Sequence, residues 1–271
     1  MMKQPSDHQP QPSGVSPERL VPVLSVEGLA KSYSGFAAVS DISFTCSAGE
    51  MVALIGPNGA GKTTTFNMIN GQTPLDRGRV YIEGRDVTGA LPRDLWRAGV
   101  ARTFQITATF TSMTVSENIA VALVSRERHA MSLEPAGSFR RDEALTLLGE
   151  VGMRDAAERI CGTLAYGDLK RVELAMALVI RPRLLLMDEP TAGMAPRERS
   201  QLMGLVSRLA RERKVAVLFT EHDMDVVFGH ADRILVMNRG ELIAQGAPDA
   251  VRRDPLVRDV YLGHGGTSGQ P

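Results

Sequence analysis

The sequence predicts an α/β protein in which a mostly parallel sheet is wrapped by helices and interrupted by a helical insert. Short apolar runs alternate with helical segments in the first and last parts of the chain. Strand signals become rare between about residues 106 and 180, where helical signals dominate. A glycine-rich loop also stands directly between an apolar strand, Met51–Ile55, and a helix, Thr63–Ile69.

The individual elements follow from these patterns. Before the insert we expect strands at Val23–Val26, Ile42–Thr45, Met51–Ile55 and Arg79–Ile82. Within it we expect helices at Val115–Val124, Asp142–Val151 and Lys170–Ile180, with an exposed irregular loop at Arg126–Arg141. After it, strands at Leu184–Met187, Val215–Thr220 and Ile234–Asn238 alternate with helices at Arg197–Arg213 and Met224–Gly229. Such alternation favours parallel strands.

Length and composition fit one soluble globular unit. The chain has 271 residues, and its 31 Lys and Arg balance its 31 Asp and Glu, so it lacks the basic excess typical of nucleic-acid binders. Its two cysteines, Cys46 and Cys161, have no metal-like spacing, which favours two buried thiols. No apolar run approaches the ~20 residues that cross a bilayer, and the N-terminus lacks a signal-peptide pattern. We therefore expect a cytosolic protein.

The domain organisation is predicted to be simple. Residues 1–19 are rich in Gln, Pro and Ser and are expected to be a disordered tail. Residues 20–263 are expected to form a single domain, with a core at 20–105 and 181–263 and a helical part at about 106–180. Residues 264–271 are expected to be a flexible, glycine-rich tail.

The glycine-rich loop reads Gly56-Pro57-Asn58-Gly59-Ala60-Gly61-Lys62-Thr63 and fits the pattern G-x-x-x-x-G-K-[ST]. Glycines let several backbone N–H groups point at phosphate oxygens, and the following helix adds its positive end. Lys62 supplies a positive charge for the phosphates, and Thr63 offers a hydroxyl to Mg²⁺. An ordinary glycine turn is the alternative, but the strand before it and the helix after it favour a phosphate-binding loop.

Two acidic residues, Asp188 and Glu189, directly follow the apolar strand Leu184–Met187. Carboxylates at the end of a buried strand are costly unless they serve a cation or a proton transfer. Asp188 suits Mg²⁺, and Glu189 is placed to act as the general base toward an attacking water. An exposed acidic strand end remains the alternative when this pair is considered alone.

Two further polar residues follow the phosphate-binding loop in an informative order. Gln105 lies where the core gives way to the helical insert, and His222 follows the strand Val215–Thr220. A single Gln is usually a solvated surface residue and a single His is usually structural. The order of the loop, Gln105, the acidic pair and His222 is what makes them candidates.

The segment Leu164-Ala165-Tyr166-Gly167-Asp168, about 20 residues before the acidic pair, identifies the family. With the loop and the acidic pair, it resembles the signature of the ATPase subunit of ABC transporters, and the similarity runs from about Leu24 to Leu262. The resemblance implies a P-loop NTPase (RecA-like) core with a small antiparallel β-subdomain and an inserted helical subdomain. It also implies that two ATPase subunits pair head to tail, so that each signature loop covers ATP bound by the other subunit.

The resemblance assigns a role to each matching residue. Tyr33 would stack on adenine, although an ordinary packed aromatic is the alternative. Gln105 would sense Mg²⁺ and contact the membrane subunits, and His222 would contact the γ-phosphate. Asp188 would be the metal-site acid and Glu189 the catalytic base. The expected cofactors are ATP and Mg²⁺, bound by the following residues: Gly56, Pro57, Asn58, Gly59, Ala60, Gly61, Lys62, Thr63, Thr64, Ala165, Tyr166, Gly167 and Asp168 for ATP, and Thr63, Gln105 and Asp188 for the metal.

The chain departs from the family pattern in two loops. The signature usually reads Leu-Ser-Gly-Gly-Gln, and here Ala165 replaces the serine while Tyr166 and Asp168 also differ. A hydrogen bond to a charged group is worth roughly 1.5–3 kcal/mol, although backbone N–H donors remain at this position. The loop after the acidic pair ends at Ala195 in place of the usual Asp or Asn. The resemblance therefore leaves open how this loop couples the two ATP sites.

The same departures resemble one branch of the family. The Leu-Ala-Tyr-Gly signature, the Ala-Arg-Thr-Phe sequence before Gln105 and the ending Val260-Tyr261-Leu262-Gly263 are similar to ATPases of branched-chain and hydrophobic amino acid importers and their urea and short-amide relatives. Lipopolysaccharide-export ATPases share the ending, but they normally have Ser-Gly-Gly in the signature. A non-transport ABC ATPase acting on ribosomes or nucleic acid is a further alternative.

The importer branch implies several partners. They are two membrane permease subunits, a second ATPase subunit that is either paralogous or identical, and indirectly a periplasmic solute-binding protein. No nucleic-acid partner is expected. The expected location is the cytoplasmic side of the inner membrane, where the chain would be peripheral.

Overall fold

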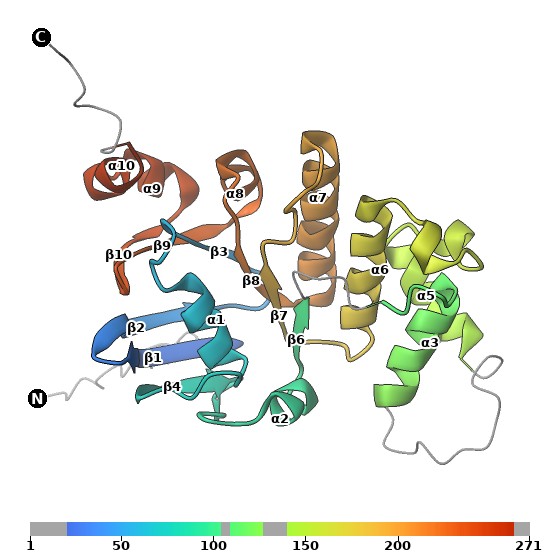
Figure 1. The fold of residues 1–271 in the computed structure, drawn as a ribbon, viewed down its shortest axis with the longest axis horizontal. Helices are drawn as coiled ribbons and strands as arrows, with labels where there is room; N and C mark the ends of the chain where they lie inside the picture. The colour runs from blue at the N-terminus through green and yellow to red at the C-terminus, as the bar shows by residue number, and fades with distance from the viewer. Residues whose placement is uncertain (1–20, 104–108, 127–139, 263–271) are drawn as a thin grey trace, which may run out of the picture.

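The computed structural model describes residues 21–103, 109–126 and 140–262 (Figure 1). These residues form two sheets, helices that cover them, and a group of inserted helices that extends to one side. The predicted tails, Gln105 and most of the predicted loop Arg126–Arg141 lie outside the described residues.

The larger sheet has six strands in the order β10-β9-β3-β8-β7-β6. All neighbouring pairs from β9 to β6 are parallel, and only β10 pairs antiparallel, with β9. The mostly parallel sheet predicted from the sequence is therefore confirmed. The strands are β3 (Met51–Ile55), β6 (Val100–Thr103), β7 (Leu184–Asp188), β8 (Ala216–Thr220), β9 (Arg233–Asn238) and β10 (Glu241–Gly246).

Both faces of the larger sheet are covered, which explains the uninterrupted apolar runs in its strands. Along β3, Met51, Ala53 and Ile55 belong to one core cluster, and Val52 and Leu54 belong to the other. The first cluster packs against helices α3 (Val115–Arg126), α5 (Arg141–Glu150), α6 (Tyr166–Leu178), α7 (Pro196–Arg213) and α8 (Met224–His230). The second packs against α1 (Lys62–Ile69), α2 (Pro92–Arg97) and the smaller sheet.

The smaller sheet is antiparallel, with the order β2-β1-β4-β5. It corresponds to the small β-subdomain expected from the family resemblance. Its hairpin turns between β1 and β2, where Tyr33 pairs with Phe36. The strands are β1 (Leu24–Tyr33), β2 (Phe36–Cys46), β4 (Arg77–Ile82) and β5 (Arg85–Asp86).

The inserted helices α3, α5 and α6 pack on one another beside β6. Two 3₁₀ turns, η1 (Arg154–Ala156) and η2 (Cys161–Thr163), connect α5 to α6, and the C-terminal helices are α9 (Pro248–Arg253) and α10 (Pro255–Leu262). Cys46 and Cys161 are free and buried, as the sequence predicted. Among the described residues, none of the helices has the length and apolarity needed to span a membrane.

The sequence analysis missed some elements and placed some boundaries incorrectly. The strands predicted at Val23–Val26 and Ile42–Thr45 extend toward each other into one long hairpin, and β6 and β10 were not predicted. Helix α6 begins at Tyr166 rather than Lys170. The low helix propensity of Gly167 and Asp168 explains why the prediction began later. In the structure Ala165, which has an extended backbone, is the N-cap, and the helix starts directly after it.

Phe219 provides a test of the core of the larger sheet. Its side chain is fully buried in the middle of β8. We predict that Phe219→Ala lowers the free energy of unfolding by about 3–5 kcal/mol, because it removes buried apolar surface and leaves a cavity. Urea unfolding followed by circular dichroism measures the change.

Phe36 offers a matched control, because its side chain is 67% exposed at the hairpin. Phe36→Ala is expected to change the free energy of unfolding by less than about 0.5 kcal/mol. Equal effects of the two substitutions would contradict the packing described above.

Candidate nucleotide-binding site

Three neighbouring parallel strands end at the same edge of the larger sheet. In the register of the sheet, Leu54 of β3 is opposite Thr220 of β8, and Thr220 is opposite Asp188 of β7. The chain continues from these positions into the glycine-rich loop at Gly56, into Glu189 and into the segment that carries His222. The carboxyl edge of a parallel sheet is where ligands bind in open α/β folds.

The glycine-rich loop is held in its curve by close backbone packing. Gly61 has φ +102°, and a Cβ there would lie 2.4 Å from the carbonyl oxygen of Ala38 on β2, so only glycine fits. Helix α1 begins directly after it, at Lys62. The Lys62 ammonium donates to the carbonyl oxygens of Gly56 at 2.7 Å and Pro57 at 3.1 Å. The lysine is thus folded back over the loop that it belongs to.

The electrostatic surroundings of Lys62 link the loop to the acidic pair. The pKa of Lys62 lies below its usual value, because the effect of burial exceeds the opposing effect of the nearby carboxylates of Glu189 and Asp188. The two acidic residues are therefore close enough to act on the lysine charge, although they lie on a different strand. The sheet brings together the three charged groups that the sequence predicted as one site.

Parts of the loop are open to solvent. Asn58 and Gly59 are exposed, and the loop borders a cavity of about 550 Å³ that Arg239 and Asp259 also line. Thr63 is exposed at the start of α1, and the next residue, Thr64, is half-buried. The backbone N–H groups of a helix start and an exposed hydroxyl are suitable partners for phosphate and its counter-ion.

Asp188 is held from two sides. Its Oδ1 accepts a hydrogen bond from the Thr220 hydroxyl at 2.7 Å, and its Oδ2 lies 3.2 Å from the Arg102 guanidinium. The same Thr220 hydroxyl accepts a hydrogen bond from the backbone N–H of Glu189 at 3.0 Å. One buried hydroxyl therefore fixes both acidic residues relative to the neighbouring strand.

Glu189 has a constrained backbone and meets the predicted histidine. Its φ of +48° lies in the left-handed region, which costs a non-glycine residue roughly 1–2 kcal/mol. Its Oε1 lies 2.8 Å from Nε2 of His222. The side chain of His222 is half exposed, so this pair faces solvent at the sheet edge. Strain of this kind is often found at functional sites.

The segments after β7 and β8 are also tied together. Buried Glu221 accepts hydrogen bonds from the backbone N–H of Thr191 at 2.9 Å and from its hydroxyl at 2.7 Å. Arg199 on α7 forms an ion pair with Asp223 and donates to the carbonyl of Met194 at 2.7 Å. The loop that ends at Ala195 is therefore coupled to the segment that carries His222.

Tyr33 lies at the tip of the β1–β2 hairpin, where its side chain is 47% exposed. The ammonium of Lys31 lies 5.5 Å from the centre of its ring. The same hairpin carries Ala38, whose carbonyl packs against Gly61. An accessible aromatic ring thus lies on the hairpin whose second strand contacts the glycine-rich loop.

The predicted signature segment lies apart from the other site residues. Ala165 is the N-cap of α6, and Tyr166, Gly167 and Asp168 form its first turn. Ala165 and Tyr166 are exposed, and no side chain caps this helix start. Helices α1 and α6 lie on opposite sides of β6 and β7 (Figure 1). The structure of one chain therefore does not bring the signature segment to its own glycine-rich loop.

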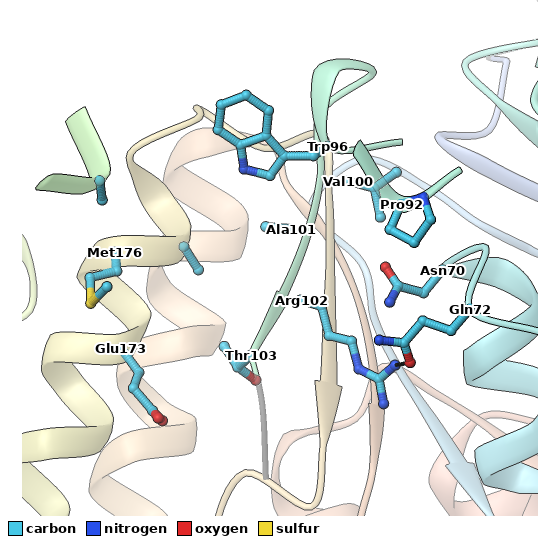
Figure 2. A pocket seen from close by; sticks show the side chains of 12 residues that line it. Asn70, Gln72, Pro92, Trp96, Val100, Ala101, Arg102, Thr103, Glu173 and Met176 are labelled. Atoms are coloured by element: carbon cyan, nitrogen blue, oxygen red, sulfur yellow. Dashed lines mark hydrogen bonds between the residues drawn. The ribbon is translucent and has the colours of Figure 1, made fainter. Parts of the chain in front are cut away.

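A cleft of about 290 Å³ lies between β6 and α6, and we call it the β6–α6 cleft (Figure 2). Its wall is mainly apolar, but it contains Arg102 and also Glu173, whose carboxylate is paired with the buried Lys170 at 2.9 Å. Thr103, two residues before Gln105, also lines it. Its apolar lining includes Trp96, Val100, Ala122, Met176 and Ala177.

Three residues of this site were not predicted from the sequence: Arg102, Thr220 and Glu221. Each adjoins a predicted element or motif, yet each is a common polar residue that forms no local pattern. Their roles depend on contacts across the sheet, which a linear sequence does not display. The one signal available in the sequence was that β6 and β8 each end in a polar residue.

Thr220→Val tests the hydroxyl that joins the acidic pair. Valine has nearly the same shape but leaves one Asp188 oxygen and the Glu189 N–H without this partner. We predict a loss of about 1–3 kcal/mol in the free energy of unfolding, measured in urea. Thr146→Val is the control, because Thr146 lies at an exposed position of α5 and its hydroxyl donates to the Asp142 carbonyl within the same helix. An equally small effect at both positions would contradict the bridging role.

Comparisons with known proteins agree with this geometry. The family model described as ABC transporter matches residues 39–192, and the model described as branched-chain amino acid ATP-binding cassette transporter matches residues 241–267. The high-affinity branched-chain amino acid transport ATP-binding protein BraF of Pseudomonas aeruginosa is 39% identical, over 89% of this chain and 98% of its own length. The lipopolysaccharide export system ATP-binding protein LptB of Haemophilus influenzae is 36% identical, over 89% and 97%.

Solved structures extend the similarity to three dimensions. An ATP-binding cassette of an ABC transporter in its ADP conformation has a TM-score of 0.81 and 31% identity, over 89% of this chain and 99% of that one. A dimeric post-hydrolysis cassette bound to ADP and Pi has a TM-score of 0.70 and 26% identity, over 83% and 98%. The chain belongs to the ABC transporter family, as one of its nucleotide-binding ATPase cassettes.

Proposed function

We propose that this chain is the ATP-hydrolysing subunit of an importer that takes up branched-chain or other hydrophobic amino acids, or related small amides, through separate permease subunits. The observation that carries the proposal is the convergence of Lys62, Asp188, Glu189 and His222 at one sheet edge. These four groups provide phosphate binding, metal binding and proton transfer in one place.

The glycine-rich loop and Lys62 bind the phosphates. Backbone N–H groups of Gly56–Thr63 donate to phosphate oxygens, and the start of α1 adds its positive end. Lys62 then exchanges the carbonyls of Gly56 and Pro57 for phosphate oxygens. Tyr33, exposed at the neighbouring hairpin, stacks on the adenine ring.

The residues present fit a Mg²⁺ ion bound together with ATP. Thr63 offers an exposed hydroxyl and Asp188 a carboxylate, and oxygen donors of this kind suit the ion. Within the described residues, no group of three or more His, Cys, Asp or Glu side chains is placed to hold a metal. The ion, when bound, neutralises charge that develops on the phosphates. Gln105 is proposed as a further contact to it.

Glu189 is the proposed general base. Nε2 of His222 lies 2.8 Å from Oε1 of Glu189, and this contact orients the carboxylate at the sheet edge. The carboxylate accepts a proton from the attacking water as the water oxygen bonds to the γ-phosphorus. The bond from the γ-phosphorus to the bridging oxygen breaks, so that ADP is the leaving group, and His222 contacts the γ-phosphate. The left-handed backbone of Glu189, held by Thr220, keeps the carboxylate at the sheet edge.

A second ATPase subunit, identical or paralogous, completes the site. The signature residues Ala165–Asp168 are accessible at the start of α6 but lie away from the loop of their own chain. Paired head to tail, each subunit places this helix start over the phosphates held by the other. Ala165 supplies no hydroxyl, so the backbone N–H groups of α6 carry this contact.

The β6–α6 cleft is the proposed docking site for a segment of each permease subunit. Thr103, which lines the cleft, lies two residues before Gln105 in the sequence, and Gln105 by resemblance to the family contacts the membrane subunits. The apolar lining of the cleft suits a short amphipathic helix. Docking there places the chain at the cytoplasmic side of the membrane. The proposed single domain at residues 20–263 then divides into a core at 20–105 and 181–263 and a helical part at about 106–180, with the cleft between them.

The importer branch is favoured by the names of the similar proteins and by the match at residues 241–267 to branched-chain amino acid cassettes. A periplasmic solute-binding protein would deliver the solute to the permeases. The similarity to a lipopolysaccharide export cassette supports an exporter as the second candidate.

Glu189→Gln tests the catalytic assignment. The carboxamide keeps the shape of the side chain but cannot accept the proton, so ATP hydrolysis should fall by about 10²–10⁴-fold while ATP binding is retained. Phosphate release and binding of a fluorescent ATP analogue measure the two properties. Glu212→Gln, at an exposed ion pair on α7, should leave both unchanged. Hydrolysis by Glu189→Gln at the wild-type rate would remove Glu189 from the role of base.

A reconstituted transporter tests the importer assignment and the cleft together. We predict that a solute-binding protein loaded with leucine, added outside vesicles that carry the complex, stimulates ATP hydrolysis several-fold. Trp96→Ala should abolish the stimulation without weakening nucleotide binding, because Trp96 lines the cleft.

Leu91→Ala is the control, since Leu91 is half exposed at the start of α2 and lies outside the cleft lining. Stimulation by lipopolysaccharide in place of the loaded binding protein would favour the exporter. Equal stimulation of wild type and Trp96→Ala would remove the cleft from the docking role.

A further inference from the structure

Arg102 connects the cleft to the acidic pair. It lies on β6, lines the β6–α6 cleft and points toward Gln72 (Figure 2). Its guanidinium donates to Asn67 at 2.9 Å, to Gln72 at 2.6 Å and to the Asp188 carboxylate at 3.2 Å. Asn67 belongs to α1, the helix that begins with Lys62. One side chain therefore bridges the helix of the phosphate-binding loop and the proposed metal acid.

The ion pair with Asp188 is largely removed from solvent. The side chains are 11% exposed for Arg102 and 13% for Asp188. A cation this close, in surroundings less polar than water, offsets much of the field of the carboxylate. An approaching divalent ion therefore meets a weaker negative potential than an isolated Asp188 would present.

Arg102 is not arranged as a purely structural ion pair. Its Nε atom is buried and has no hydrogen-bond partner among the described residues. An unsatisfied buried N–H is costly and is rare in native structures unless it has a role. Two of its three partners are uncharged side-chain oxygens, and one of these, on Gln72, is exposed. The guanidinium is thus shared between the Asp188 carboxylate and two neutral amide side chains.

We propose that Arg102 is a positioning residue that sets the Mg²⁺ affinity of the nucleotide site by competing for the Asp188 carboxylate. The proposal rests on the proposed function only in that it takes Asp188 as the metal acid. Because Arg102 forms part of the cleft wall, a segment that docks in the cleft and contacts the guanidinium would alter the metal site. Docking in the cleft would then act on Asp188 electrostatically, through Arg102.

The test titrates the full chain with Mg²⁺ and follows the binding of a fluorescent ATP analogue. The readout is nucleotide binding and not hydrolysis. Arg102→Gln should lower the Mg²⁺ concentration at half-maximal binding on the order of tenfold, because the competing charge is gone. Arg102→Lys keeps a positive charge and should stay near the wild-type value. Arg183→Gln should not change it, because Arg183 directly precedes β7 and its exposed side chain pairs with Glu83.

Gln72→Glu provides a second variant on the exposed surface, where misfolding is not expected. Its carboxylate should draw the guanidinium away from Asp188 and lower the Mg²⁺ midpoint in the same direction. In the Arg102→Gln background this effect should disappear, which separates it from direct attraction of Mg²⁺ by the new charge.

An unchanged or higher Mg²⁺ midpoint in Arg102→Gln would overturn the proposal, and so would a Gln72→Glu effect that persists without Arg102. These outcomes leave the proposed function intact, because they concern the midpoint and not hydrolysis or transport. Absence of Mg²⁺-dependent nucleotide binding by the wild type would overturn both.

Discussion

The parallel pairing of β3, β8 and β7 is the constraint on which the rest of the site depends. It places the ends of three strands that are far apart in the chain at one edge of a sheet. The register that sets Thr220 opposite both Leu54 and Asp188 decides which side chains meet there. Because side chains alternate along a strand, a slip of one residue would turn the Thr220 hydroxyl away from Asp188.

The burial of both sheet faces explains why polar residues gather at the edge. Alternate residues of β3, β7 and β8 enter two separate core clusters, so neither face can accept an unpaired charge. Asp188 escapes this cost because Thr220 and Arg102 bond its two oxygens. The same contacts hold the carboxylate in a fixed orientation. Stability and site geometry thus depend on one set of hydrogen bonds.

Much of the fold class and of the candidate site could be predicted from the sequence. The glycine-rich loop and the acidic pair were predictable because each is a contiguous motif beside an apolar strand. The pairing of Glu189 with His222 was predicted only as an order of residues, and the structure adds the distance between them. The position of Gln105 stays a prediction, because it lies outside the described residues.

The missed parts have physical reasons. Strand β6 has only four residues, one of them charged, and the β1–β2 hairpin contains small and polar residues that weaken its apolar alternation. Arg102 belongs to no local pattern, since all three of its partners are distant in the chain. Long-range polar contacts of this kind require coordinates.

Helix α6 lies apart from α1 in one chain, and in the proposed function a second subunit supplies the other wall of the nucleotide site. The most direct measurement is a crystal structure of the chain with Mg²⁺ and a non-hydrolysable ATP analogue. We predict that the γ-phosphate lies between Lys62 and His222, with Lys62 released from its loop carbonyls. The start of α6 from a second subunit should lie on the opposite side of the phosphate. A nucleotide bound away from the Asp188–Glu189 edge would contradict it.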